Sequence, residues 1–343
     1  EGLAGIAEFS ESFGSAGLSG VIERLVQKII GLDARAHQRI SQQLFAATRL
    51  APGGINSQAI GAIENALLDL EGKALGVPVY ELLGGAVRDR IEVYWSSCGI
   101  HRLDENFARL IGRPALRGLD DLVALGEEVR DSSFLSFKTC IYLFDDRPRA
   151  YMSGFGPAAG WPELNATPQI IAALREQLAA LRQGAGPSVG IRLDLNFNFK
   201  PEGYLQVTRA LDDLDLAWFE IDLYEPAALR RIRDSVGTPI ASCESLYGLR
   251  EFRPYFEHRA MDVAIVDAPW NGVWQALKIA SMAEAYEVNV APHNFTGNLS
   301  TLMSAHLSAA LPNFRVLELD VDRVPWKDEF ITWVPEVKDG YHA

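Results

Sequence analysis

The 343-residue sequence predicts an α/β protein in which a (β/α)-type barrel follows a smaller, mostly helical region. Three observations favour this fold class. The first ninety residues show helical periodicity, the residues from about 91 onward alternate short β-rich runs with helical segments, and charged or polar side chains stand where the runs end. A doubly wound open sheet is the alternative architecture, because it has the same alternation of strands and helices.

Composition and charge narrow the classes of function. Apolar residues make up 48% of the chain and charged residues 22%, an ordinary balance for a globular protein with a substantial core. The formal net charge of −13 argues against nucleic acid and anionic membranes as partners, because both are negatively charged. Three cysteines, none in a Cys-x-x-Cys pair, indicate neither a disulfide framework nor a thiolate zinc site. With no recognisable targeting segment at its start, the chain is expected to be a cytoplasmic enzyme with a small-molecule substrate.

Two helices are expected in the first ninety residues. One covers residues 19–30. The other follows the turn Pro52-Gly53-Gly54, with Asn56 as the expected N-cap, and its apolar side chains recur every three or four residues from Ile60 to Ala74. Gly76-Val77-Pro78 is expected to end it.

Eight predicted strands alternate with helices in the rest of the chain. The strands are expected at Ile91–Ser96, Phe134–Thr139, Gly190–Leu195, Leu216–Glu220, Thr238–Cys243, Asp262–Val266, Val288–Ala291 and Phe314–Leu319. Helices between them include Pro168–Arg182, Ala227–Val236 and Val273–Tyr286. Because the working side chains of such barrels lie at the carboxyl ends of strands, these ends form a shortlist. It contains Lys138, Cys140, Asp194, Asn196, Glu220, Glu244, Asp267, His293 and Glu318.

Three acidic residues of the shortlist predict a metal site. Asp194, Glu220 and Glu244 end consecutive predicted strands and are 26 and 24 residues apart, about one βα unit each. Neighbouring barrel strands would aim them at one point, where carboxylates repel one another unless a cation lies between them. All-oxygen ligation suits Mg²⁺, and Asn196 would join the site or contact the ligand. The simpler alternative is three ordinary ion-paired acids at strand ends.

A histidine and an aspartate form a second predicted group. His293 and Asp267 end neighbouring strands, 26 residues apart, so the carboxylate can accept one ring N–H and raise the basicity of the other nitrogen. Lys138 is expected to bind a substrate carboxylate oxygen, with a surface lysine as the alternative. Together with a divalent cation, these groups can remove a proton alpha to a carboxylate and stabilise the resulting enediolate.

The segment 142–167 is unusually long for a connection between a strand and a helix. It contains Arg147, Arg149, Tyr151 and Trp161 among several glycines. Long loops at the carboxyl face of a barrel often serve as lids or bind substrate. A solvated insertion is the alternative of equal weight.

Several stretches resemble the mandelate racemase branch of the enolase superfamily, and the resemblance runs over nearly the whole chain. It implies a modified (β/α)7β TIM-type barrel with an α+β capping domain, divided into a cap at 1–90, a barrel at 91–319 and a C-terminal segment at 320–343 that returns to the cap. The first strand of the cap is expected to be missing, and a homo-oligomer from dimer to octamer is expected. The matching stretches are 62–70, 76–85, Leu193–Asn196, Trp218–Glu220, Pro239–Glu244 and Ala291–Asn294.

The resemblance also implies roles for the shortlisted side chains. It implies that Mg²⁺ binds to Asp194, Glu220 and Glu244. It also implies that the Asp267–His293 pair is the base and that Glu318 forms a hydrogen bond with the enediolate.

One departure from the family pattern bears on the reaction. Cys140 stands where many members carry the second lysine of a Lys-x-Lys pair, a base on the opposite face. A two-base racemase is then hard to build, although a Cys140 thiolate stays an alternative. The single-lysine pattern is similar to that of acid-sugar dehydratases of the galactonate dehydratase type. We therefore expect a Mg²⁺-dependent hydro-lyase that forms a 2-keto-3-deoxy sugar acid, with a racemase, epimerase or cycloisomerase, or a silent sugar-acid-binding member, as alternatives.

Other departures concern the pocket and the proton donor. Trp270 lies in a stretch that lacks the usual double glycine and is expected to shape the pocket, and Cys243 replaces a frequent glycine. The acid that protonates the departing hydroxyl stays open. Protonated His293 would serve in a syn elimination, and Tyr151 or His101 in an anti elimination.

Overall fold

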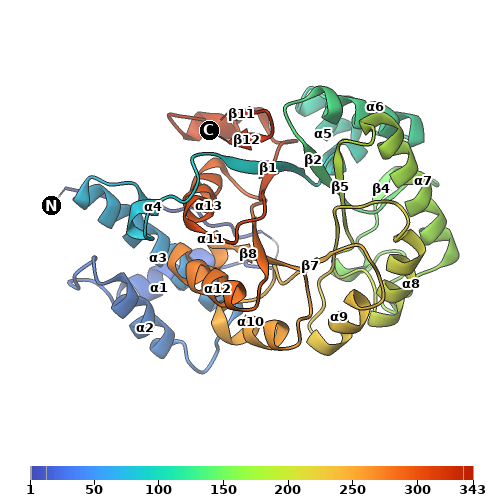
Figure 1. Ribbon diagram of the computed structural model, residues 1–343. Coiled ribbons are helices and arrows are strands. Elements are labelled where there is room, and N and C mark those ends of the chain that lie inside the picture. The colour runs from blue at the N-terminus through green and yellow to red at the C-terminus, as the bar shows by residue number, and fades with distance from the viewer. Residues whose placement is uncertain (1, 13, 335, 343) are drawn as a thin grey trace. The chain divides into compact units, whose positions relative to one another are not determined.

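The computed structural model describes residues 2–12, 14–334 and 336–342, which form two compact units (Figure 1). The first unit contains the chain up to Ile91 together with Glu244–Phe256 and Ala264–Leu317. The second unit contains Glu92–Cys243, Glu257–Val263 and the chain from Glu318 onward.

The N-terminal part of the first unit is a helical bundle around one long helix, α3. Its helices are α1 (Leu18–Val26), α2 (His37–Ala47), α3 (Gly54–Leu75) and α4 (Val79–Leu82). Helices α1, α2 and α3 lie together, coloured blue in Figure 1. Burial of apolar side chains between them holds the bundle together. The side chains of this core are Leu18, Leu25, Ile40, Leu44, Ala59 and Ile63.

The two ends of α3 test the predicted signals for helix start and stop. The prediction of Asn56 as the N-cap was wrong, because its side-chain amide donates to the carbonyl oxygen of Ala51 in the preceding turn, and the helix already begins at Gly54. The predicted stop is confirmed. Gly76 has a left-handed backbone with φ of 70°, and the N–H of Val77 donates to the carbonyl of Gly72, closing the helix end.

The remaining elements of the first unit include two neighbouring strands that end in predicted site residues. Strand β8 (Val263–Asp267) ends at Asp267, and β9 (Asn289–His293) ends at His293. The accompanying helices are α10 (Gly248–Glu257), α11 (Ala268–Asn271), α12 (Val273–Ala285) and α13 (Asn298–Ala310).

The N-terminal segment of the first unit is tied to two of its helices. The N–H of Ile6 donates to Asp69 on α3 at 2.7 Å. The carboxylate of Glu8 accepts the N–H groups of Gly297 at 2.6 Å and Ser300 at 3.1 Å, at the start of α13. These are helix N-terminal amides without partners inside the helix, so Glu8 caps α13 from a distant part of the chain.

The second unit contains a sheet whose neighbouring strands β1, β2, β5, β6 and β7 are parallel. The register pairs Lys138 with Arg192 and Asp194 with Glu220, so these residues lie at the same edge of the sheet. Strand β10 pairs with β1, and the hairpin β11–β12 lies beyond β1 in the strand order. The bounds are β1 (Ile91–Ser96), β2 (Ser136–Thr139), β5 (Gly190–Asp194), β6 (Trp218–Glu220), β7 (Ile240–Ser242), β10 (Leu317–Asp320), β11 (Val337–Lys338) and β12 (Tyr341–His342).

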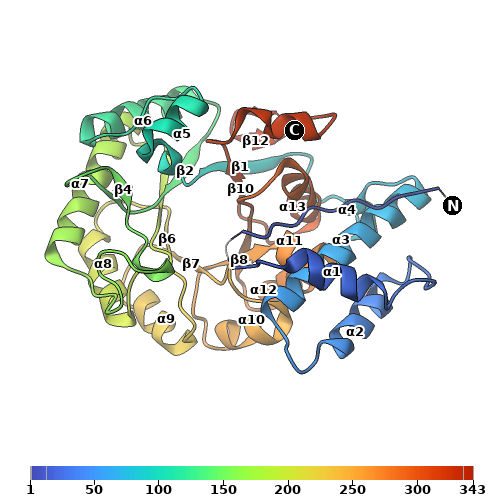
Figure 2. The same cartoon turned by 180° about the vertical axis from the view of Figure 1, so that it is seen from behind.

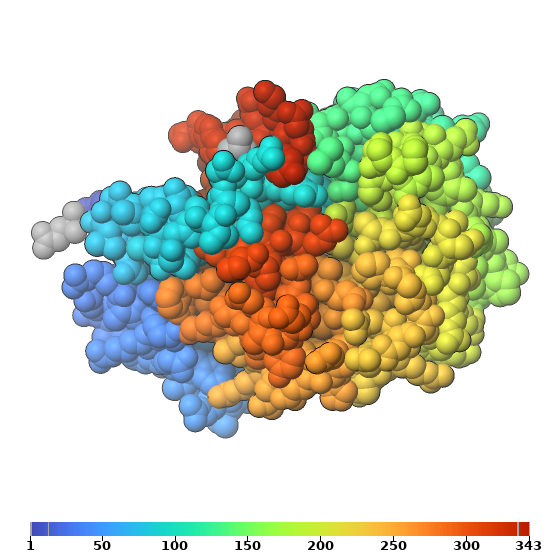
Figure 3. All heavy atoms as spheres, viewed as in Figure 1, coloured from blue at the N-terminus to red at the C-terminus, as the bar shows by residue number. Residues whose placement is uncertain are grey.

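Helices follow the strands of this sheet. Figure 2 shows α6 beside α7, and in Figure 3 the outer faces of α7, α8 and α9 (light green to yellow) lie at the surface. The predicted long connection 142–167 carries a short hairpin, β3 (Tyr142–Leu143) with β4 (Arg149–Ala150), and the turn η2 (Ser153–Phe155). The helices and remaining turns are η1 (Ile100–Leu103), α5 (Glu105–Leu110), α6 (Leu119–Asp131), α7 (Pro168–Ala185), α8 (Pro201–Leu211), α9 (Pro226–Arg233) and η3 (Pro325–Phe330).

A buried ion pair ties the turn after β1 to the segment after β10. Arg102 is 1% exposed and donates to Asp322 through Nη2 at 2.7 Å and Nε at 3.1 Å, and to Glu128 at 2.6 Å. Asp322 also accepts the N–H of Gly99 at 3.1 Å. The pair therefore fixes two chain segments that flank the strand ends β1 and β10.

Removing the charge of Arg102 is expected to destabilise the protein strongly. Arg102→Met would leave Asp322 buried without its counter-charge, so the free energy of unfolding should fall by about 3–5 kcal/mol in denaturant titrations. The matched control is Arg117→Met, which breaks an exposed pair with Glu105 and should leave the free energy of unfolding close to the wild-type value. Equal losses in the two variants would contradict the role given to Arg102.

None of the helices formed by residues 2–12, 14–334 and 336–342 combines the length and apolar character that crossing a membrane requires.

Candidate active site

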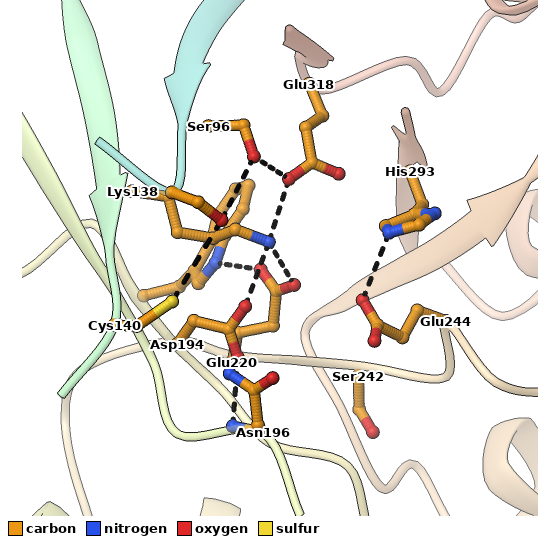
Figure 4. Close-up of polar contacts among 12 residues, drawn as sticks. Ser96, Lys138, Cys140, Asp194, Asn196, Glu220, Ser242, Glu244, His293 and Glu318 are labelled. Atoms are coloured by element: carbon orange, nitrogen blue, oxygen red, sulfur yellow. Dashed lines mark hydrogen bonds and ion pairs between the residues drawn. The ribbon is translucent and has the colours of Figure 1, made fainter. Parts of the chain in front are cut away.

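Four predicted site residues of the second unit meet at its strand ends. The ammonium of Lys138, at the end of β2, lies 2.6 Å from Glu220 Oε1, 3.1 Å from Asp194 Oδ2 and 3.0 Å from Glu318 Oε1. Figure 4 shows the lysine directed into the group of carboxylates. All four side chains are buried. The predicted alternative of a surface lysine is therefore wrong, because the parallel register carries Lys138 to the edge where the acids stand.

The electrostatics of this cluster follow from its charges. Burial alone would lower the pKa of Lys138, but the neighbouring carboxylates Glu220, Glu318 and Asp194 outweigh it and hold the pKa well above 10.5. One ammonium thus faces three carboxyl groups in a region of low water content. The cluster keeps an excess of acidic groups, which favours a further cation.

Each carboxylate of the cluster has a second fixed contact. Trp218 donates its indole N–H to Glu220 Oε2 at 2.9 Å. Asn196 donates its side-chain N–H to Asp194 Oδ1 at 2.6 Å, so the predicted contact of Asn196 is with an acid of the cluster. Glu318 Oε1 accepts the hydroxyl of Ser96 at 2.5 Å. These bonds set the orientation of the carboxylates.

Cys140 follows Lys138 by two residues, and its side chain is buried. Its Sγ is 4.0 Å from the hydroxyl oxygen of Ser97. Burial, with a smaller contribution from Asp194, raises the pKa of the Cys140 thiol far above its usual range. The raised pKa favours the neutral thiol, which argues against the thiolate base considered from the sequence.

The first unit brings together four further predicted residues. Asp267 Oδ2 lies 2.6 Å from His293 Nδ1, and its Oδ1 accepts the N–H of Trp270 at the start of α11. The other imidazole nitrogen, Nε2, is 3.6 Å from Glu244 Oε2 (Figure 4). Trp270 packs against the imidazole with ring centroids 5.1 Å apart. The aspartate thus holds one nitrogen of His293 and directs Nε2 toward Glu244.

Two strand ends adopt backbone conformations that ordinary residues seldom use. Asn196 has φ of 48° after β5, and Cys243 has φ of 91° after β7. Glycine adopts such values without strain, which accounts for the glycine that the family resemblance implies at position 243. Asn196 follows Asp194 by two residues, and Cys243 directly precedes Glu244. The unusual backbone conformation at each of these positions therefore affects the direction of the neighbouring acidic side chain.

The two residues predicted as anti-elimination acids have packing contacts. His101 lies in η1 with its ring 4.8 Å from that of Phe107. Tyr151 is buried against Phe199 with centroids 5.9 Å apart, and its hydroxyl has no hydrogen-bond partner among the described residues. Both remain predictions as proton donors.

The side chains fit magnesium by their chemistry. Asp194 and Glu220, paired in the register of β5 and β6, offer carboxylate oxygens, the donors that hard divalent cations prefer. Glu244 carries a further carboxylate in the first unit. Within the part of the chain that the structure describes, no three or more His, Cys, Asp or Glu side chains lie close enough together to hold a metal ion as they stand. Lys138 is paired with both Asp194 and Glu220, so a cation would have to share or take over these oxygens.

Two residues that hold the acids, Ser96 and Trp218, are not on the shortlist of predicted strand-end residues. Ser96 is the last residue of the predicted first strand, and that position was available in the sequence. Trp218 stands two residues before Glu220 and so on the same face of β6. Both side chains are uncharged, and a shortlist based on acids and bases passes over them.

Family comparisons match both parts of the chain. The enolase C-terminal domain-like model matches residues 160–343. The model of the mandelate racemase / muconate lactonizing enzyme N-terminal domain matches residues 1–84.

Individual relatives include several dehydratases. The chain is 26% identical to a D-xylonate dehydratase of Haloferax volcanii, over 98% of this chain and 78% of that protein. It is 28% identical to a D-galactonate dehydratase of Variovorax paradoxus, over 85% of this chain and 69% of that protein.

A solved structure with higher identity carries a different name. It is a protein from Burkholderia xenovorans strain LB400, named for L-alanine-DL-glutamate epimerase and bound to magnesium and fumarate. It is 48% identical, has a TM-score of 0.95, and covers 98% of this chain and 84% of its own. The matches confirm the predicted fold class, an α/β barrel with an N-terminal capping domain.

Proposed function

Because the chain belongs to the enolase superfamily, in its mandelate racemase / muconate lactonizing enzyme family, we propose that it is a Mg²⁺-dependent acid-sugar dehydratase. The substrate is a sugar acid with a hydroxyl on the carbon next to the alpha carbon. The product is a 2-keto-3-deoxy sugar acid. The dehydratases among the relatives support this substrate class.

One observation carries the choice of dehydration over racemisation. Among the predicted strand-end residues that the structure describes, one imidazole, His293, is hydrogen-bonded to a carboxylate, that of Asp267, and a buried thiol, Cys140, stands where a second lysine base would be. Racemisation through two bases needs a proton acceptor on each face of the alpha carbon. Elimination needs only one.

The first step is removal of the alpha proton. We assign it to His293 Nε2, because Asp267 accepts Nδ1–H and thereby leaves the lone pair on Nε2. Lys138, whose ammonium pairs with three carboxylates in this structure, would turn one N–H to a substrate carboxylate oxygen, where negative charge develops as the proton leaves. We assign Glu318, held by Ser96 and Lys138, to a hydrogen bond with the same oxygens.

The second step is loss of the neighbouring hydroxyl. The electron pair of the broken C–H bond forms the new double bond, and the C–O bond breaks with its pair on oxygen. A proton from protonated His293, or from Tyr151 or His101, converts the departing hydroxide to water. The enol product then takes up a proton on the carbon that lost the hydroxyl, gives up the proton of its enol O–H, and becomes the 2-keto acid.

The proposed metal ligands are Asp194, Glu220 and Glu244. When bound, Mg²⁺ supplies positive charge to the substrate carboxylate and so lowers the energy of its dianionic form. The protein from Burkholderia xenovorans is described with bound magnesium, which supports this choice of ion.

Further features of the proposal concern the setting of the enzyme. We place the cap in residues 1–90, the catalytic barrel in 91–319 and the returning segment in 320–343. Three unpaired, buried cysteines fit a reducing compartment, and we propose a cytoplasmic homo-oligomer.

A screen of mono- and diacid sugars with Mg²⁺ tests the proposed function. We expect one or a few of them to yield 2-keto-3-deoxy products, detected with semicarbazide and by mass spectrometry, and chelation of the metal to stop turnover with recovery on readdition. Exchange of the alpha proton with solvent deuterium without loss of water would instead support an epimerase, the activity in the name of the Burkholderia xenovorans protein. If the protein showed no turnover, no proton exchange and no Mg²⁺ binding, it would be a catalytically inactive member of the family.

A further inference from the structure

The indole of Trp218 has a specific contact with an acid of the candidate site. Strand β6 reads Trp218-Phe219-Glu220, and residues two apart in a strand share one face. The indole N–H donates to Glu220 Oε2 at 2.9 Å, while Lys138 holds Oε1 at 2.6 Å. Trp218 and Glu220 are each 1% exposed, so water does not compete for this bond.

The indole is itself held in place. The guanidinium carbon of Arg192 lies 4.3 Å from the centroid of the Trp218 ring. The ring of Tyr94 meets it edge to face, with centroids 5.8 Å apart and planes at 88°. Packed on these sides, the indole presents its N–H in one direction.

We propose that Trp218 is a positioning residue that orients Glu220 for the divalent cation, an inference that rests on the proposed function. A carboxylate oxygen accepts more than one contact, so the indole bond is compatible with a cation on the same carboxylate. A charge-assisted hydrogen bond from a rigid donor removes the rotational freedom that Glu220 would otherwise lose on binding. Loss of such a partner weakens metal affinity by about 10–100-fold.

A pair of identical substitutions tests the proposal. Trp218→Phe keeps an aromatic ring and removes the N–H. The matched control is Trp95→Phe, since Trp95 is also buried in this sheet and its indole N–H has no hydrogen-bond partner among the described residues. The readout is the dissociation constant of Mg²⁺ or Mn²⁺, measured by calorimetry without substrate, next to thermal unfolding of each variant in chelator.

We expect Trp218→Phe to weaken metal binding by about 10–100-fold and Trp95→Phe to leave it near the wild-type value. Wild-type affinity in a folded Trp218→Phe, or equal weakening in both variants, would overturn the proposal. Failure of the wild-type protein to bind either metal would instead refute the proposed function.

A second pair of variants covers the case in which phenylalanine prevents folding. Incorporation of 3-benzothienylalanine at position 218 keeps the shape of the indole and replaces N–H with sulfur. The same replacement at position 95 is the control. Weaker metal binding only at position 218 supports the proposal, and unchanged binding at both positions overturns it.

Discussion

The variant His293→Asn should lose dehydration, with kcat lower by about 10³–10⁴-fold. An asparagine amide can still donate to Asp267, which receives Nδ1–H in the native protein at 2.6 Å, but it has no basic nitrogen to take the alpha proton. Exchange of the alpha proton with solvent deuterium should disappear together with product formation. Both are measured on one substrate by mass spectrometry and NMR.

Metal affinity provides the control for this variant. The proposed ligands are carboxylates, so Mg²⁺ binding by His293→Asn should stay near the wild-type value. Normal turnover in a folded, metal-binding variant would refute the assignment of His293 as the base. Turnover lost together with metal binding would point instead to a disturbed Glu244, whose Oε2 lies 3.6 Å from the imidazole Nε2.

Lys138→Met should strongly lower the stability of the protein. It removes an ammonium that lies within 3.1 Å of carboxylate oxygens of Asp194, Glu220 and Glu318, all buried, and so takes away positive charge that offsets theirs. Measured by denaturant titration in chelator, the free energy of unfolding should fall by about 3–5 kcal/mol. Added Mg²⁺ should restore part of this loss, because it supplies positive charge to the same carboxylates.

The effect of pH on this variant follows from the raised pKa of Lys138. A group whose pKa is higher in the folded than in the unfolded state stabilises the protein fully below the unfolded value, here 10.5, and loses its effect as pH rises through the folded value. The difference between wild type and Lys138→Met should therefore stay constant between about pH 6 and 9.

Lys73→Met is the control, since Lys73 forms an ion pair with Asp69 at 2.6 Å in which the two side chains are 41% and 31% exposed. It should cost less than about 1 kcal/mol. Equal and Mg²⁺-independent losses in Lys138→Met and Lys73→Met would contradict the role given to Lys138.

The strands were predictable because their pattern is local. Each of the eight predicted strands overlaps an observed one, and β1 matches residue for residue. Errors occur at the ends. The second strand was expected from Phe134 but begins at Ser136, since apolar composition extends beyond the paired residues. Strand β9 continues through Pro292 to His293, although proline usually ends a strand because it lacks an N–H.

The site was predictable where a charge stands at a strand end. Lys138, Asp194, Glu220 and Glu318 were found by this rule, and the structure brings them together. The hydrogen-bond partners of these side chains could not be predicted from the sequence, because a bond such as that from Ser96 to Glu318 joins residues more than two hundred positions apart. The metal and catalytic roles remain predictions that the variants above test.

The Glu8 cap on α13 has a practical consequence for protein engineering. Expression variants trimmed past Glu8, or fused to tags that displace this stretch, would leave the amides of Gly297 and Ser300 bare just beyond His293. Such preparations would show faster amide exchange and easier protease cleavage at that helix start. If a trimmed protein is inactive, the cause would then be loss of order between His293 and the start of α13. Its inactivity would not be evidence against the reaction proposed for the intact chain.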